Sequence, residues 1–274
     1  YSLYQNGLFR TYDYPPLFNS ANLSIRSFVN KGQEKVIGSR DGLFYINEAT
    51  GVVKSFVKPV LTSDLILTIC FYQGEYYIGT YGGGMMVLNP ETLSLKYFAQ
   101  GDTELFQKGH IFCVKPDAKG NLWIATQGKG LFRYSPQKNK EWEKYGLEKG
   151  FNSLTVNHLC INKDNEIWAA TSEGLYLYNP LKDIFTYQPL RLPNECINAI
   201  LEGEDCLWLT TAKGLVKYTP ATQETQIFTK SDGLQSEAFI MASALKTRNG
   251  EFYIGSINGF NTFYPHQLKL NTQK

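Results

Sequence analysis

The chain has 274 residues, and its 27 Lys and Arg against 25 Asp and Glu give a formal charge of +2. This balance argues against a nucleic-acid-binding face, which requires clustered Lys and Arg. The 24 Gly, 18 Tyr and 17 Phe favour short strands and tight turns over helices.

The longest apolar stretches, such as residues 65–72, are far shorter than the roughly 20 residues of a membrane-spanning helix. The sequence therefore predicts no transmembrane helix and no insertion of this segment into a membrane. It begins at Tyr1 without a basic or apolar signal region. Any secretion signal is thus expected to have been removed or to lie outside this sequence.

Six copies of one pattern follow one another along the chain. Each copy has an aromatic or apolar residue, a small residue, Thr or Ser, a polar loop that ends in Gly, and an apolar strand. The copies are KVIGSRDGLFYIN, YYIGTYGGGMMVLNP, LWIATQGKGLFRYSP, IWAATSEGLYLYNP, LWLTTAKGLVKYTP and FYIGSINGFNTFYP. Their anchor residues, Val36, Tyr77, Trp123, Trp168, Trp208 and Tyr253, are separated by 41, 46, 45, 40 and 45 residues. This period, with apolar residues alternating at every second position, is typical of propeller blades and not of helical repeats.

Each copy predicts four strands, A to D. Strand A is expected at residues 25–29, 66–71, 111–114, 156–161, 197–201 and 241–245, and strand B carries the anchor. The Gly before strand C is expected to supply the positive φ of the B–C turn at Gly42, Gly84, Gly130, Gly174, Gly214 and Gly259. Strand D is expected to be the most exposed, with Phe98, Trp142, Phe185 and Phe228 as its aromatic members.

The last copy ends at strand C, over residues 259–264, and lacks a strand D. Near the N-terminus, Phe9 and Tyr12 have the same spacing as Trp142 and Tyr145 of an outer strand. We therefore expect residues 9–12 to pair with residues 259–264 and close the ring. The predicted fold is an all-β, six-bladed β-propeller of four-stranded blades, with residues 1–274 as one domain. The alternative is a fragment of a seven-bladed propeller or of a tandem array, in which residues 1–12 remain from an upstream blade.

The three Trp anchors are expected to pack between blades and not to stack on a ligand. None of the five Cys lies in a CxxC motif or at metal-ligand spacing from a His, so the sequence predicts neither a metal site nor a cofactor. Cys70, Cys113 and Cys160 lie in apolar runs and are expected to be buried thiols. Cys196 and Cys206 could pair only if the geometry allows it, and no disulfide framework is predicted.

The units GNLWIATQGKGLFRYSP and NEIWAATSEGLYLYNP resemble the two-component regulator propeller repeat, which occurs in periplasmic sensor regions of hybrid two-component systems of Bacteroidetes. The resemblance covers almost the whole chain, and residues 232–268 resemble the terminal blade of such arrays. It implies a periplasmic, non-catalytic sensor segment of an inner-membrane receptor, with carbohydrate as the ligand class. The histidine kinase would then lie elsewhere in the polypeptide, since this chain has no nucleotide-binding glycine box.

Catalysis is a weaker alternative, because propellers also include hydrolases and lyases. The turn from Asp117 to Trp123 departs from the Ser-x-Asp-x-Gly-x-x-Trp order of sialidases, and the acidic residues recur at no fixed position in the repeats. The three His residues are too few for an axial metal site. His110 and His158 are expected to be hydrogen-bonded residues at the starts of strands.

Residues that differ between copies at equivalent loop positions predict the ligand-binding face. They follow the Thr or Ser of strand B or stand second in strand A: Arg26, Arg40, Tyr81, Gln127, Asn157, Asn198, Lys213 and Asn258. Such a mixture suits a polar neutral or weakly anionic ligand, such as an oligosaccharide. Two alternatives remain at this point. These residues are merely solvated, or the propeller is a scaffold that forms a homodimer or packs on neighbouring domains of the same receptor.

Overall fold

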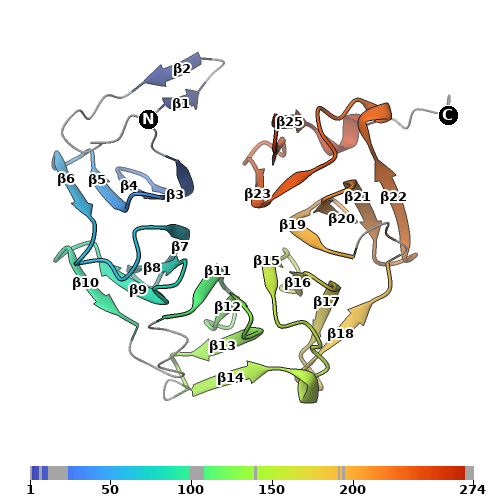
Figure 1. Ribbon diagram of the computed structural model, residues 1–274, viewed down its shortest axis with the longest axis horizontal. Coiled ribbons are helices and arrows are strands. Elements are labelled where there is room, and N and C mark those ends of the chain that lie inside the picture. The colour runs from blue at the N-terminus through green and yellow to red at the C-terminus, as the bar shows by residue number, and fades with distance from the viewer. Residues whose placement is uncertain are drawn as a thin grey trace.

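The computed structural model describes residues 2–5, 8–11, 24–98, 108–138, 141–190, 192 and 195–268. Six antiparallel sheets follow one another in chain order and form the blades of a ring (Figure 1). Their innermost strands, β3, β7, β11, β15, β19 and β23, lie side by side around the centre. The predicted six-bladed β-propeller is confirmed.

The blades have these strands. Blade 1 contains β3 (Ile25–Lys31), β4 (Glu34–Ser39), β5 (Leu43–Asn47) and β6 (Val52–Phe56), and blade 2 contains β7 (Ile66–Tyr72), β8 (Glu75–Thr80), β9 (Met85–Asn89) and β10 (Ser94–Tyr97). Blade 3 contains β11 (His110–Pro116), β12 (Leu122–Gln127), β13 (Leu131–Ser135) and β14 (Glu141–Tyr145), and blade 4 contains β15 (Val156–Ile161), β16 (Ile167–Thr171), β17 (Gly174–Asn179) and β18 (Ile184–Gln188). Blade 5 contains β19 (Ile197–Glu202), β20 (Leu207–Thr211), β21 (Gly214–Thr219) and β22 (Glu224–Phe228), and blade 6 contains β23 (Phe239–Lys246), β24 (Phe252–Ser256) and β25 (Gly259–Phe263).

Helix in the described part of the chain is limited to Lys108 and to three short 3-10 turns, η1 (Leu147–Lys149), η2 (Lys230–Asp232) and η3 (Pro265–Gln267). None of these turns has the length or apolar character needed to cross a membrane.

The expected closure of the ring by the N-terminal strand is wrong. Strand β2 (Leu8–Thr11) pairs with β1 (Ser2–Gln5) in a separate two-stranded sheet, and the sixth blade has three strands. Figure 1 shows this pair and β25 on opposite sides of the break in the ring. Only Asn6-Gly7 separates β1 from β2, and Asn-Gly is a strong hairpin signal. Local pairing also costs less loop-closure entropy than pairing across some 250 residues.

The turn between the second and third strands is built in the same way in all six blades. Its last Gly has a positive φ in every copy, from 71° at Gly84 to 135° at Gly259, as the sequence predicts. The hydroxyl of the Ser or Thr that ends the second strand donates to the carbonyl oxygen of this Gly in each blade, at 2.7–3.1 Å. The recurrent Thr or Ser of the repeat therefore fixes the turn.

The three Trp anchors lie between blades, as expected. Trp123, Trp168 and Trp208 are at most 1% exposed. Each belongs to an apolar cluster that includes residues of the following blade. None of the five Cys, which all lie in the described part of the chain, forms a disulfide: Cys70, Cys113 and Cys160 are buried, and Cys196 and Cys206 are half-buried.

Blade 5 packs one face of its sheet against blade 6. The corresponding face of blade 6 is exposed. In blade 5 the side chains of Leu201, Trp208 and Leu215 lie on the packed face and are 8%, 1% and 0% exposed. At the equivalent positions of blade 6, set by the strand register, Leu245 and Phe260 are 59% and 61% exposed. The edge of β25 pairs with no further strand in the described part of the chain.

Candidate functional site

The strand register places the eight predicted ligand-binding residues at one end of the ring. In each blade the first residues of the innermost strand pair with the last residues of the second strand, as in Ile25 with Ser39 and Ile197 with Thr211. Arg40, Lys213 and Asn258 are exposed in the adjoining turns, and Gln127 is exposed as the last residue of β12. The ring centroid of Tyr81 lies 4.0 Å from that of His110.

The innermost strand has a β-bulge near its start in blades 1 to 5, and the unpaired residue is the second of the strand, except in blade 3, where Phe112 is the third residue of β11. In blade 6 the irregularity is longer, since four residues, 240–243, stand opposite Gly255 alone. Bulges turn side chains away from the regular alternation of a strand. The same bulge therefore carries three of the eight predicted residues, Arg26, Asn157 and Asn198.

Asn157 and Asn198 connect neighbouring blades. The side-chain amide of Asn157 donates to the carbonyl of Ile197 at 2.9 Å, and that of Asn198 donates to the carbonyl of Phe239 at 2.8 Å. Asn157 is only 3% exposed. Both side chains thus satisfy backbone groups of the next blade. The sequence carried a signal for this role, because Asn occupies the same position in two consecutive copies.

His158 makes a similar contact. Its Nδ1 accepts a hydrogen bond from the backbone N–H of Ile200 at 3.2 Å, so the proton of the neutral ring is on Nε2. Burial, and secondarily the ammonium of Lys115, lower the pKa of His158 to about 3. The imidazole is therefore neutral at physiological pH.

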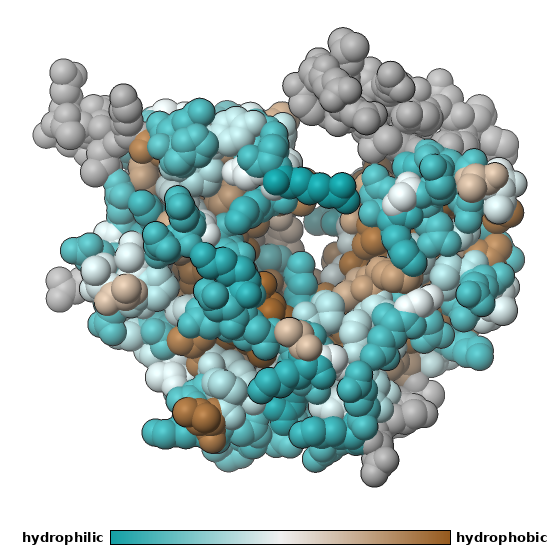
Figure 2. Space-filling model, turned by 180° about the vertical axis from the view of Figure 1, so that it is seen from behind, coloured by the Kyte–Doolittle hydropathy of each residue, from teal (hydrophilic) through white to brown (hydrophobic). Residues whose placement is uncertain are grey.

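A central cavity of 520 Å³ lies inside the ring. Its lining includes Arg26, Phe112, Lys115 and His158 from blades 1, 3 and 4, and residues 242–245 of blade 6. Of the eight predicted residues only Arg26 lines it. Figure 2 shows an opening through the middle of the ring, with apolar surface around it.

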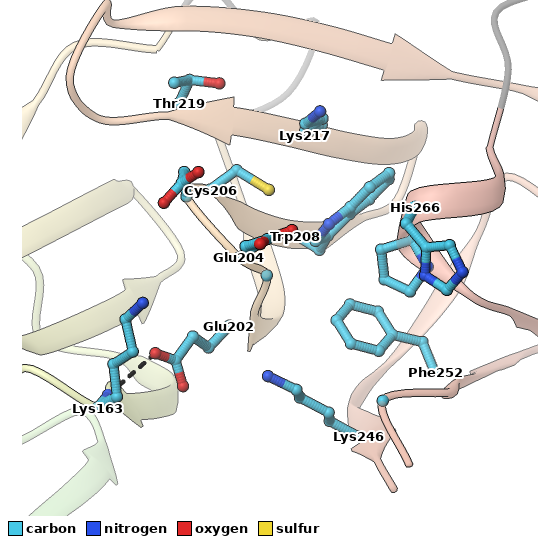
Figure 3. A pocket seen from close by; sticks show the side chains of 14 residues that line it. Lys163, Glu202, Glu204, Cys206, Trp208, Lys217, Thr219, Lys246, Phe252 and His266 are labelled. Carbon is cyan, nitrogen blue, oxygen red and sulfur yellow. Dashed lines mark hydrogen bonds between the residues drawn. The ribbon is translucent and has the colours of Figure 1, made fainter. Parts of the chain in front are cut away.

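The opposite end of the ring has pockets between neighbouring blades. The pocket between blades 5 and 6 has a volume of 650 Å³ and is lined by three Lys and three acidic residues (Figure 3). Trp208, Phe252 and Pro265 form its apolar part. The numbers of positive and negative side chains that line this pocket are therefore equal.

The pocket between blades 3 and 4 contains a network of hydrogen bonds centred on Asp183. The hydroxyls of Tyr145 and Tyr178 donate to Asp183 Oδ1 at 2.7 and 2.5 Å, Arg133 donates to the same atom at 2.9 Å, and Lys149 donates to Oδ2 at 2.7 Å. Burial alone would raise the pKa of Asp183, but hydrogen bonds from Lys149 and the two Tyr, with the charge of Arg133, hold it well below its usual range. This carboxylate joins the two blades.

Trp208 differs from the other Trp anchors in the partner of its indole. The indole N–H of Trp123 donates to Asp117 at 2.9 Å, and that of Trp168 donates to Glu166 at 3.3 Å. The indole nitrogen of Trp208 is buried without a hydrogen-bond partner, and the thiol of Cys206 points toward it (Figure 3). Cys206 occupies the position of Glu166, two residues before the anchor, and a thiol is a weak acceptor.

We expect Cys206→Glu to raise the free energy of unfolding by about 0.5–1.5 kcal/mol, because it supplies the acceptor that Trp208 lacks. Chemical denaturation of the two proteins measures the difference. Cys206→Gln, whose carbonyl also accepts, should retain part of the gain, and Cys206→Leu should retain none. Equal stability of the Glu and Leu variants would contradict the assignment.

The described residues contain no group of three or more His, Cys, Asp and Glu that could hold a metal ion.

Comparison with known proteins adds three observations. Residues 106–128 match the model of the two component regulator propeller family. The chain is 27% identical over 286 residues to histidine kinase P4 of Formosa agariphila, an alignment that covers 84% of this chain and 20% of the kinase.

Solved structures with the same fold include extracellular domains of Bacteroides thetaiotaomicron. The extracellular domain described as that of the hybrid two component system BT3049 aligns with a TM-score of 0.58 and 21% identity over 90% of this chain and 39% of that one. For the domain of BT4673, described as a one component system, the TM-score is 0.56 and the identity 14%, over 93% of this chain and 41% of that one. The chain thus spans about a fifth of the kinase and about two fifths of each extracellular domain.

Proposed function

We propose that this chain, whose repeats resemble the two-component regulator propeller repeat, is the ligand-sensing, non-catalytic segment of a signalling receptor and lies outside the cytoplasm. The observation that carries the proposal is the repeat itself, which occurs six times and matches the family model in its third copy. The similarity to a histidine kinase and to extracellular domains of two-component systems supports it. A kinase elsewhere in the polypeptide would receive the signal.

Carbohydrate is the ligand class that we propose for this sensor, bound at the end of the ring that carries Arg26, Arg40, Tyr81 and Gln127. Guanidinium, amide and phenol groups are exposed there on a rigid scaffold, an arrangement that suits a polar ligand with many hydroxyl groups. The side-chain amides of Asn157 and Asn198 already donate hydrogen bonds to the next blade. The proposal therefore depends on the exposed residues of this end.

Calorimetric titration of the chain with a panel of plant and host glycan oligosaccharides tests the proposal. We expect at least one oligosaccharide to bind, and Arg40→Ala or Gln127→Ala to weaken that binding up to tenfold. The melting temperature should stay unchanged, because both side chains are exposed. Binding that is unaffected by either variant would place the site elsewhere, and a panel without any binding would contradict carbohydrate sensing.

A second candidate function is supported by the open face of blade 6. Leu245 and Phe260 expose apolar surface that blade 5 buries against its neighbour, and the adjoining edge of β25 is unpaired in the described chain. This surface suits association with another β-sheet, from a neighbouring domain or a second copy. Light scattering after gel filtration tests the second copy. A concentration-dependent dimer that Phe260→Glu dissociates, in a chain that binds no glycan, would favour a scaffold over a sensor.

A further inference from the structure

The innermost strands of the ring carry mostly positive charge. Across β3, β7, β11, β15, β19 and β23 the charged residues are Arg26, Lys31, Lys115 and Lys246 against Glu202 alone. The whole chain, in contrast, is nearly balanced, with a formal charge of +2. The surplus of cations is therefore concentrated around the central axis.

Arg26 and Lys115 line the central cavity together, and its lining includes no Asp or Glu. Neither side chain forms an ion pair with another described residue. The pockets between blades differ in this respect, since each contains at least one carboxylate beside its cations. Two cations without counter-ions in one cavity create a positive potential that attracts anions.

The other polar groups around this cavity fit the same ligand chemistry. His158 is neutral and carries its proton on Nε2, so it can donate a hydrogen bond but adds no negative charge. Glu202, the one acidic residue of the innermost strands, is the last residue of β19, and its Oε1 accepts the backbone N–H of Lys163 at 2.9 Å. It lines the pocket at the opposite end of the ring and not the cavity.

The two cations are separated along the axis. Arg26 stands at the bulge of β3, level with Phe112 at the bulge of β11, and Lys115 lies three residues further along β11. Three residues of strand correspond to about 10 Å. An elongated ligand with more than one anionic group matches this spacing of the two backbone positions.

We propose that the central cavity binds anionic groups of an acidic oligosaccharide, with Arg26 and Lys115 as their partners. The charges that line the cavity support an anionic ligand, whereas the proposal that this ligand is a saccharide rests on the proposed function. Guanidinium pairs with carboxylate or sulfate in a bidentate manner, and the ammonium of Lys115 supplies a point charge further along the axis.

The test is calorimetric titration of the chain with trigalacturonate, with its methyl ester and with sodium sulfate. The ester removes the charge and keeps the sugar rings. We expect trigalacturonate to bind at least tenfold more tightly than the ester, and Arg26→Gln and Lys115→Gln each to weaken it at least fivefold. Lys182→Gln is the matched control, since Lys182 is exposed in the turn between β17 and β18 and belongs neither to the cavity lining nor to the predicted ligand-binding residues. Thermal melting of all variants verifies that they fold.

The outcomes separate this proposal from the function on which it rests. Sulfate binding that Arg26→Gln abolishes, without binding of trigalacturonate, would keep the anion site and remove the saccharide. Equal affinity for trigalacturonate and its ester, with no effect of Arg26→Gln or Lys115→Gln, would overturn the anion site and leave carbohydrate sensing intact. No binding of trigalacturonate or sulfate at millimolar concentration would overturn the proposal.

Discussion

Replacement of Trp168 by Ala is expected to lower the free energy of unfolding by about 3–5 kcal/mol, the range of large-to-small substitutions in a packed core. Trp168 is 1% exposed and lies in the apolar cluster that joins blades 4 and 5, with its ring centroid 6.3 Å from that of Tyr218. Its removal leaves a cavity between two blades and deprives Glu166 of a donor. Urea denaturation followed by circular dichroism measures the loss.

Tyr253→Ala is the matched control, because Tyr253 is the anchor of blade 6 and is half-buried, whereas Trp168 is fully buried between two blades. The ring of Tyr253 stacks on that of Phe260 at 6.1 Å, and its hydroxyl donates to Glu251 at 3.2 Å. We expect its removal to cost less than half as much as that of Trp168. Equal losses at the two positions would mean that packing on the next blade is not what makes the anchor important.

The blade was predictable from the sequence because its determinants are local and repeat. The Gly before each third strand adopts the positive φ that its turn demands, and the preceding Ser or Thr binds the carbonyl of that Gly in all six copies. The Trp anchors recur at positions that only the interior of a propeller can bury. Because the same turn and anchor recur six times, the sequence indicates one blade structure throughout the chain.

The closure of the ring was not predictable from spacing alone. The spacing of Phe9 and Tyr12 fits an outer strand, but it does not decide which strand such a segment pairs with. The Asn6-Gly7 sequence favours the local partner β1, and this signal outweighs the resemblance to Trp142 and Tyr145.

The candidate site was only partly predictable, because the sequence does not say which way a bulge residue points. Arg26 and Asn157 stand at the same position of the repeat, and the structure directs Arg26 to the cavity and Asn157 to the next blade. Lys115 was missed. Its signal was available, because it is one of few charges in the innermost strands, but recognising it requires knowing that these strands face the axis.

Asp183→Asn is expected to lower the free energy of unfolding by about 1–3 kcal/mol at neutral pH, since hydrogen bonds to a charged acceptor contribute in this range. Asp183 accepts from Tyr145 and Tyr178 of neighbouring blades and pairs with Arg133 and Lys149. Asn tolerates the φ of 53° at this position and keeps one acceptor oxygen, so the variant removes the charge and one of the two acceptor oxygens without straining the backbone. Asp164→Asn, at an exposed turn position, is the control and should change stability by less than about 0.5 kcal/mol.

The effect of Asp183→Asn should depend on pH in a defined direction. The pKa of Asp183 is held below its usual value of 3.8 in the folded protein, so the carboxylate stabilises the fold at every pH above that value. As the pH falls below about 4, the unfolded chain binds a proton at this position before the folded chain does, and the stabilisation is lost progressively. The difference between the variant and the parent protein should therefore be constant from pH 8 to pH 5 and shrink below pH 4. A difference that persists undiminished at pH 3 would show that the charge of Asp183 is not what joins the two blades.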